Sequence, residues 1–108
     1  MGDDSFRDYV LDQLRGLDQV RPRAMFGGFG LYSGEVFFGI VADGRLYFKT
    51  DEESRGEYER WGMGPFRANE KQTLWSYYEV PVDILEDDEA LALWALRACQ
   101  SQSLPPST

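Results

Sequence analysis

The chain contains no histidine and a single cysteine, Cys99, among its 108 residues. Without histidine it lacks the usual general base of Ser-His-Asp and Cys-His catalysis and the most frequent metal ligand. One cysteine cannot form an intrachain disulfide or a cysteine-rich zinc or iron–sulfur site. These absences predict a protein that is not an enzyme and that uses no metal and no cofactor.

Basic residues and long apolar runs are also scarce. Lys and Arg total 11 against 19 Asp and Glu, which gives a net charge of -8 and an isoelectric point near 4.4. Nucleic-acid binding requires clustered basic residues, so the charge argues against direct DNA binding. No run approaches the ~20 apolar residues that span a bilayer, and the amino terminus does not resemble a signal peptide. With one unpaired thiol, we expect a cytoplasmic protein without membrane contact.

What the chain does contain is enough apolar material for one packed domain. Hydrophobic residues make up 43% of the chain and aromatic residues 15%, which excludes a disordered polymer. The length fits a single domain. We expect this domain over residues 1–100 and a flexible tail over 101–108, where Pro105 and Pro106 interrupt a serine-containing sequence.

The residue pattern predicts an α+β fold in two layers. Helical spacing of apolar residues, acidic caps and glycine or proline stops mark the helices. Alternating aromatic and β-branched residues mark antiparallel strands. The order is helix, three strands, helix, one or two strands, helix, which favours an antiparallel sheet with segregated helices. The expected helices cover residues 6–17, 51–61 and a segment from 83 or 87 onward, and the strands lie within 24–50 and 72–80.

Asp43 and Gly44 mark a hairpin turn, whose register follows from hydrophobic alternation. A two-residue loop pairs Ala42 with Arg45 and mixes polar and apolar residues on both faces. A three-residue loop that adds Ala42 pairs Val41 with Arg45 and collects apolar side chains on one face. Because a slip of one residue turns every side chain to the other face, we predict the three-residue loop.

Residues 21–50 carry four basic and two acidic residues and form the one segment of net positive charge, and a glycine cluster lies within it. One interpretation is a small-anion or nucleotide site made by Arg21, Arg23, Lys49 and the backbone N–H groups of Gly27 and Gly28. The alternative is that the glycines allow a bulge or close packing and the basic residues are ordinary surface charges. No strand, glycine loop and helix follow one another here as in phosphate-binding motifs, so the structural interpretation is favoured.

Aromatic residues alternate along the expected strands. Tyr47, Trp75 and Tyr77 are predicted to form a surface for a protein partner of unknown identity or for a second copy of the chain, as in a homodimer. Base stacking is another use of such residues, but Glu79 and Asp83 make the neighbourhood acidic. We therefore favour a protein partner.

Residues 21–32, which read RPRAMFGGFGLY, resemble the signature of the TfoX/Sxy amino-terminal domain. Two further segments are similar to that family, DGRLYFK at 43–49 and SYYEVP at 76–81. The resemblance extends over roughly residues 5–100. It implies a two-layer fold similar to secretion chaperones and a role in regulating natural-competence genes together with a cyclic-AMP receptor transcription factor. It defines no catalytic residues.

The chain ends where the family's carboxyl-terminal domain would begin, so the resemblance implies a stand-alone amino-terminal domain. The leading hypothesis is a non-enzymatic protein-interaction or regulatory domain. The alternative is a small-anion or nucleotide sensor that uses the basic segment 21–49.

Overall fold

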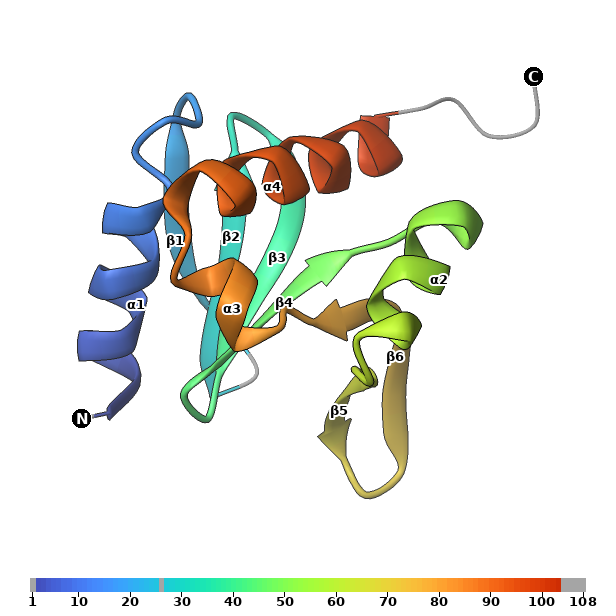
Figure 1. Cartoon of the computed structure of the whole chain (residues 1–108). Coiled ribbons are helices and arrows are strands. Elements are labelled where there is room, and N and C mark those ends of the chain that lie inside the picture. The colour runs from blue at the N-terminus through green and yellow to red at the C-terminus, as the bar shows by residue number, and fades with distance from the viewer. Residues whose placement is uncertain (1, 26, 104–108) are drawn as a thin grey trace.

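The computed structural model describes residues 2–25 and 27–103. Its elements in chain order are α1 (Gly2–Gln13), β1 (Val20–Met25), β2 (Gly28–Ser33), β3 (Val36–Ala42), β4 (Arg45–Lys49), α2 (Glu52–Arg60), β5 (Pro65–Asn69), β6 (Gln72–Glu79), α3 (Val82–Leu85) and α4 (Asp88–Ser103). The strands form one antiparallel sheet in the order β1-β2-β3-β4-β6-β5 (Figure 1). The α+β class predicted from the sequence is confirmed.

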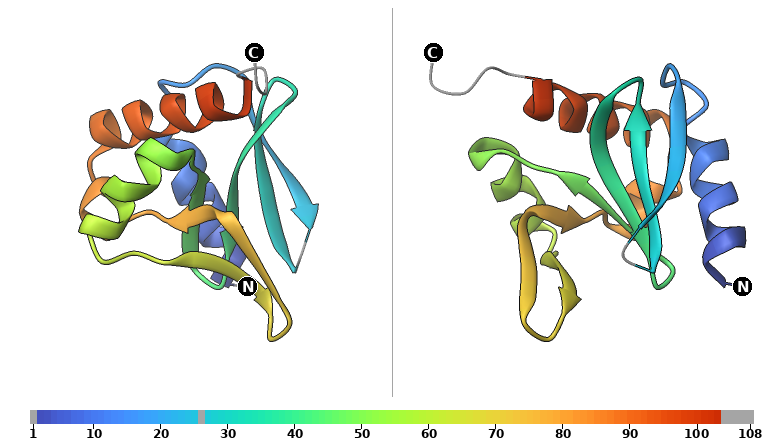
Figure 2. Two further views of the ribbon diagram at one scale, coloured as in Figure 1. Left: turned by 90° about the vertical axis from the view of Figure 1, so that its right-hand side faces the viewer. Right: turned by 180° about the vertical axis from the view of Figure 1, so that it is seen from behind.

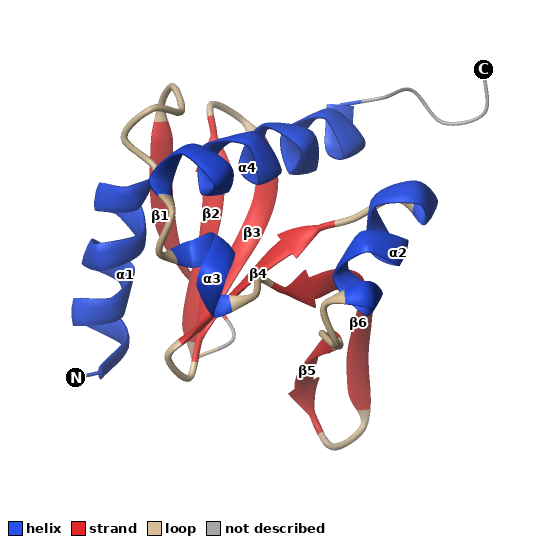
Figure 3. Ribbon diagram, in the orientation of Figure 1, coloured by secondary structure: helices blue, strands red, loops and turns tan. Residues whose placement is uncertain are grey.

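Helices cover one face of the sheet (Figures 2 and 3). The main core contains buried residues of both the helices and the strands. Helix α4 packs across β3 and β4, and α1 packs beside it. Val10 of α1, Phe48 of β4 and Leu91 of α4 are fully buried there. Among the described residues, no helix is both long enough and apolar enough to cross a membrane.

A second, smaller apolar cluster lies on the other face of the sheet. It joins Ile40 and Ala42 of β3 to Tyr47 of β4, Phe66 of β5 and Tyr77 of β6. Paired residues on adjacent strands share a face, and Ile40 pairs with Tyr47 while Val41 pairs with Leu46 of the main core. Strands β3 and β4 are therefore buried on both sides.

The predicted three-residue hairpin loop is wrong. Ala42 pairs with Arg45, and Asp43 and Gly44 form a two-residue turn with φ values of 54° and 69°, the left-handed pair typical of a tight hairpin. The prediction assumed that one face of the hairpin would be polar. The second cluster removes that condition, and a shift in the β2–β3 register at Leu31 and Tyr32 breaks the alternation on which the prediction depended.

Several predicted element boundaries also change. The first helix ends at Gln13, and the chain then enters β1, an edge strand that accommodates Pro22. Four strands, rather than three, precede α2. Two helices, α3 and α4, replace the single expected start at 83 or 87, and α4 continues through Ser103 into the segment expected as a tail. Residues 104–108 of that tail lie outside the described part of the chain.

Helix α2 and strand β6 match their predictions closely. Asp51 caps α2 by accepting a hydrogen bond from the Ser54 backbone N–H at 2.8 Å, and the Ser54 hydroxyl accepts from the Asp51 N–H at 3.0 Å. This reciprocal arrangement satisfies two backbone donors that the helix cannot pair internally. The cap fixes where α2 begins, and α2 forms one wall of the site described below.

Candidate functional site

The glycines of the conspicuous motif shape the turn between β1 and β2. Gly27 has a φ of 74°, which only glycine adopts easily. Gly28 faces the backbone of Val41, where an added Cβ would overlap the carbonyl oxygen. The prediction that the glycines allow close packing is therefore confirmed at Gly28. Phe26, from the same motif, lies outside the described residues.

The structure brings some of the predicted anion-binding residues together but not all of them. Arg21 and Arg23 lie on β1 beside a shallow hollow of about 430 Å³ that Tyr32 and Gly34 also line. Arg21 donates to the Gly34 carbonyl at 3.1 Å, and the Arg23 guanidinium lies 6.0 Å from the centre of the Tyr32 ring. Lys49 is on β4, which β2 and β3 separate from β1. Anion or nucleotide binding by this set stays a prediction.

Two of the three residues expected to form a partner surface are buried. Tyr47 and Tyr77 retain only 8% and 7% exposure, because Phe66 packs 4.8 Å from the first ring and Phe37 packs 5.3 Å from the second. Both belong to the second cluster. Trp75 remains 68% exposed.

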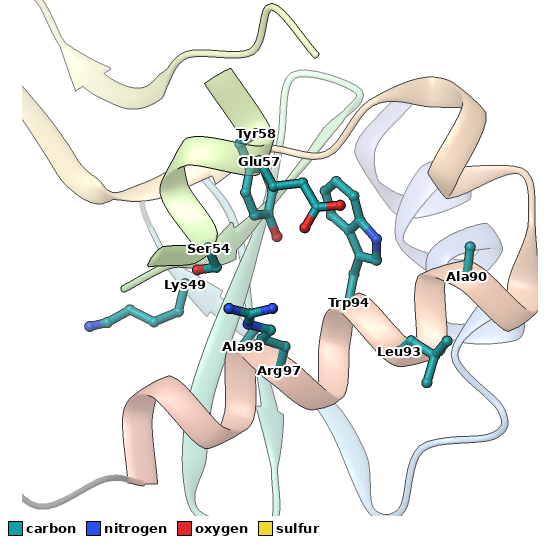
Figure 4. A pocket seen from close by; sticks show the side chains of 9 residues that line it. All are labelled: Lys49, Ser54, Glu57, Tyr58, Ala90, Leu93, Trp94, Arg97 and Ala98. Carbon is teal, nitrogen blue, oxygen red and sulfur yellow. The ribbon is translucent and has the colours of Figure 1, made fainter. Parts of the chain in front are cut away.

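The structure instead opens a hollow of about 270 Å³ between α2 and α4 (Figure 4). Tyr58 of α2 and Trp94 of α4 meet edge to face across it, with ring centres 4.7 Å apart. The lining side chains come from both helices and from the end of β4: Lys49, Ser54, Glu57, Tyr58, Ala90, Leu93, Trp94, Arg97 and Ala98.

Tyr58 is the most unusual residue of this hollow. It is 4% exposed, its hydroxyl is directed into the hollow (Figure 4), and no hydrogen bond reaches that hydroxyl from residues 2–25 or 27–103. Burial raises the pKa of the Tyr58 hydroxyl far above its ordinary value. The group therefore stays neutral and keeps its proton to donate.

The charged groups around the hollow are of mixed sign. The Arg97 guanidinium faces the Tyr58 hydroxyl, and the Glu57 carboxylate flanks it, whereas the Lys49 ammonium group points away (Figure 4). Arg97 reaches Glu53 at 3.4 Å, but both side chains are exposed, and such pairs contribute little. The Arg97 guanidinium is thus available to a ligand at modest cost.

Asp51, the N-cap residue of α2, also forms a hydrogen bond with α4. The Asp51 carboxylate that caps α2 also accepts a hydrogen bond from the Ser101 hydroxyl of α4 at 3.1 Å. The Ser54 backbone N–H is the main cause that lowers the pKa of Asp51, and the Ser101 hydroxyl adds to the effect. The Asp51 carboxylate at the start of α2 therefore also links α2 to the last turns of α4.

The outer face of α4 is apolar and uncovered. Leu93 and Leu96, three residues apart and so on one side of the helix, are 68% and 46% exposed. They border a second hollow of about 680 Å³, where Leu17 and Cys99 add apolar surface. Asp18 and Glu89 give it an acidic rim. Burial raises the pKa of the Cys99 thiol, which keeps it protonated.

Sequence reasoning missed both α4 surfaces. The periodicity places Leu91, Trp94, Ala95 and Ala98 toward the core and leaves the other leucines without a role. One signal was present, because residues 90–98 are apolar at every position except Arg97. A helix that buries only one face does not require this composition. No motif marks Tyr58 or Arg97.

The sequence is similar to that of a known protein family. Residues 12–102 match the family described as TfoX N-terminal domain. The chain is also 34% identical over 61 residues to the DNA transformation protein TfoX1 of Aliivibrio fischeri strain ATCC 700601 / ES114. That match covers 56% of this chain and 29% of the relative, so the chain spans less than a third of the relative's length.

Proposed function

The chain belongs to the TfoX N-terminal domain family, and on this premise we propose that it is a non-enzymatic protein-interaction domain of a regulatory system. The relative it resembles is named for DNA transformation, which supports a role connected with competence. The domain would dock a protein partner on the outer face of α4. The exposure of Leu93 and Leu96 beside an apolar hollow carries this proposal.

The energetics of this face favour an interface. Burying one leucine contributes roughly 1.5–3 kcal/mol relative to leaving it in water. Contiguous exposed apolar surface with a polar rim is typical of protein-binding sites. Leu93 and Leu96 line one hollow together with Leu17 and Ala92, so their apolar surface extends beyond the two leucines.

The charge of the rim indicates which partner would fit. Asp18 and Glu89 border the patch, and the chain as a whole carries a net charge of -8. A partner segment with apolar residues flanked by lysine or arginine would complement both features. A second copy of the chain would bring like charges together, so we favour a different protein.

Site-specific photo-cross-linking in cells tests the proposal. A photoreactive amino acid is placed at position 96 and, as a matched control, at position 82, where Val82 is 60% exposed on α3. We expect a discrete protein adduct from position 96 that is absent from position 82 and that Leu93→Asp removes.

The adducts also discriminate between partners. An adduct with the mass of two chains would identify a homodimer instead, which light scattering after size exclusion would confirm. Identical adducts at both positions, or none at position 96, would contradict docking on α4.

A further inference from the structure

We propose that the hollow between α2 and α4 binds a small monocarboxylate that carries one aromatic or branched apolar group. The Tyr58 hydroxyl and the Arg97 guanidinium would hold the carboxylate, and Trp94 would contact the apolar group. This site adjoins the docking face, because Leu93 lines both hollows, but Tyr58, Trp94 and Arg97 line only the site between α2 and α4. The inference therefore does not depend on the proposed function.

The Tyr58 hydroxyl is the first reason to infer a ligand. Buried polar groups in proteins almost always have a hydrogen-bond partner. Tyr78 packs against Tyr58, and the Tyr78 hydroxyl donates a hydrogen bond to the Glu59 carboxylate at 3.0 Å. Tyr58 has no such acceptor in the described part of the chain. Its side chain is equally buried as a whole, but its hydroxyl oxygen is accessible from the hollow. This oxygen faces the open space of the hollow, which an acceptor can enter.

The surrounding charges select the kind of acceptor. Arg97 faces the same space (Figure 4), and a guanidinium binds a carboxylate through two parallel hydrogen bonds. The Glu57 carboxylate also lines the hollow and would repel an anion of higher charge, such as a phosphate monoester. One negative charge shared between Tyr58 and Arg97 fits this arrangement better than two.

The remaining walls select an apolar group next to that charge. Trp94, Leu93, Ala90 and Ala98 present carbon to the hollow. A volume of about 270 Å³ lies near the lower end of ligand cavities, so it suits a ligand with one ring rather than a nucleotide. Small alanines at two positions leave the space that the ring would fill.

Titration with phenylacetate, followed by NMR of the tryptophan indole N–H groups, tests the inference. The Trp94 signal should shift and saturate, while the exposed Trp75 provides an internal reference. Phenylacetamide, which has the same shape without the charge, should bind about tenfold more weakly. Arg97→Gln should weaken phenylacetate binding by about tenfold and remove the preference over the amide.

Matched variants separate the site from general effects. Arg45→Gln removes an exposed arginine that pairs with Glu79 outside the hollow, and it should leave binding unchanged. Tyr58→Phe should weaken phenylacetate binding, and Leu96→Ser should not.

Three outcomes would overturn the inference. The first is no saturable shift of Trp94 at about 10 mM phenylacetate. The second is equal binding of the acid and the amide. The third is equal loss of binding in Arg97→Gln and Arg45→Gln.

Discussion

The glycine-rich turn between β1 and β2 and the hollow between α2 and α4 use their distinctive residues in opposite ways. Gly28 lets two backbones meet so closely that no atom fits between them. Tyr58 and Arg97 instead hold polar groups around an open space. The turn carries a recognisable sequence motif, but the structure leaves no room beside Gly28 for a ligand. The residues of the hollow form no motif, but they surround a space that a ligand can enter. In this chain the proposed binding site is therefore marked by the polar groups around a hollow and not by unusual composition.

The largest expected effect comes from adding a side chain at Gly28, where the two backbones are already in contact. Gly28→Ala should lower the free energy of unfolding by about 3 kcal/mol, because the new methyl group would overlap the Val41 carbonyl and the backbones would have to separate. Urea denaturation measures the change. Gly56→Ala is the matched control, since its position in the middle of α2 is open and alanine should stabilise the helix by about 0.5–1 kcal/mol. Equal stability of the two variants would contradict the close backbone contact at Gly28.

A smaller effect should distinguish the two tyrosines near the hollow. Tyr78→Phe removes a hydrogen bond to the Glu59 carboxylate and should lower the free energy of unfolding by about 1.5 kcal/mol. Tyr58→Phe removes a hydroxyl that has no hydrogen bond in the described structure, so its unfolding free energy should change by less than about 0.5 kcal/mol. Thermal and urea unfolding of both variants provide the test. A large loss in Tyr58→Phe would show that its hydroxyl is already engaged.

The smallest of the three effects concerns the cap that joins α2 to α4. Asp51→Ala should lower the free energy of unfolding by about 1 kcal/mol near neutral pH. The folded-state pKa of Asp51 lies below its ordinary value, so its contribution is present above the unfolded pKa of about 3.9. It is lost as the pH falls through the folded-state pKa.

Unfolding at pH 7 and pH 3 checks the cap. The difference between wild type and Asp51→Ala should shrink at the lower pH. Asp83→Ala, an exposed residue of α3, should show little difference at either pH. A constant difference for Asp51→Ala would mean that its charge plays no part.

The sequence predicts those parts of the fold that depend on neighbouring residues. Asp51 caps α2 as expected, and residues 72–79 form a strand, because caps and β propensity act locally. The hairpin register failed because it depends on the second apolar cluster, which joins β3 to β5. The burial of Tyr47 and Tyr77 has the same cause.

The candidate site was less predictable than the fold. Its walls come from α2 and α4, whose residues lie about 40 positions apart in the chain. From the sequence alone, Arg97 is a basic residue near the end of a helix, and Tyr58 is one of several aromatic residues expected in a core. Only their positions in space show that both face the same hollow.

Pro22 disfavours the pairing of a further strand with β1, an edge strand of the sheet. It lies in β1 between Arg21 and Arg23, on the edge of the sheet. An incoming strand would find no N–H at Pro22 and would have to bring its backbone up to two cations. The sheet therefore resists growth from this side by the addition of further chains. Concentrated solutions of the protein should remain free of fibrils that start at β1.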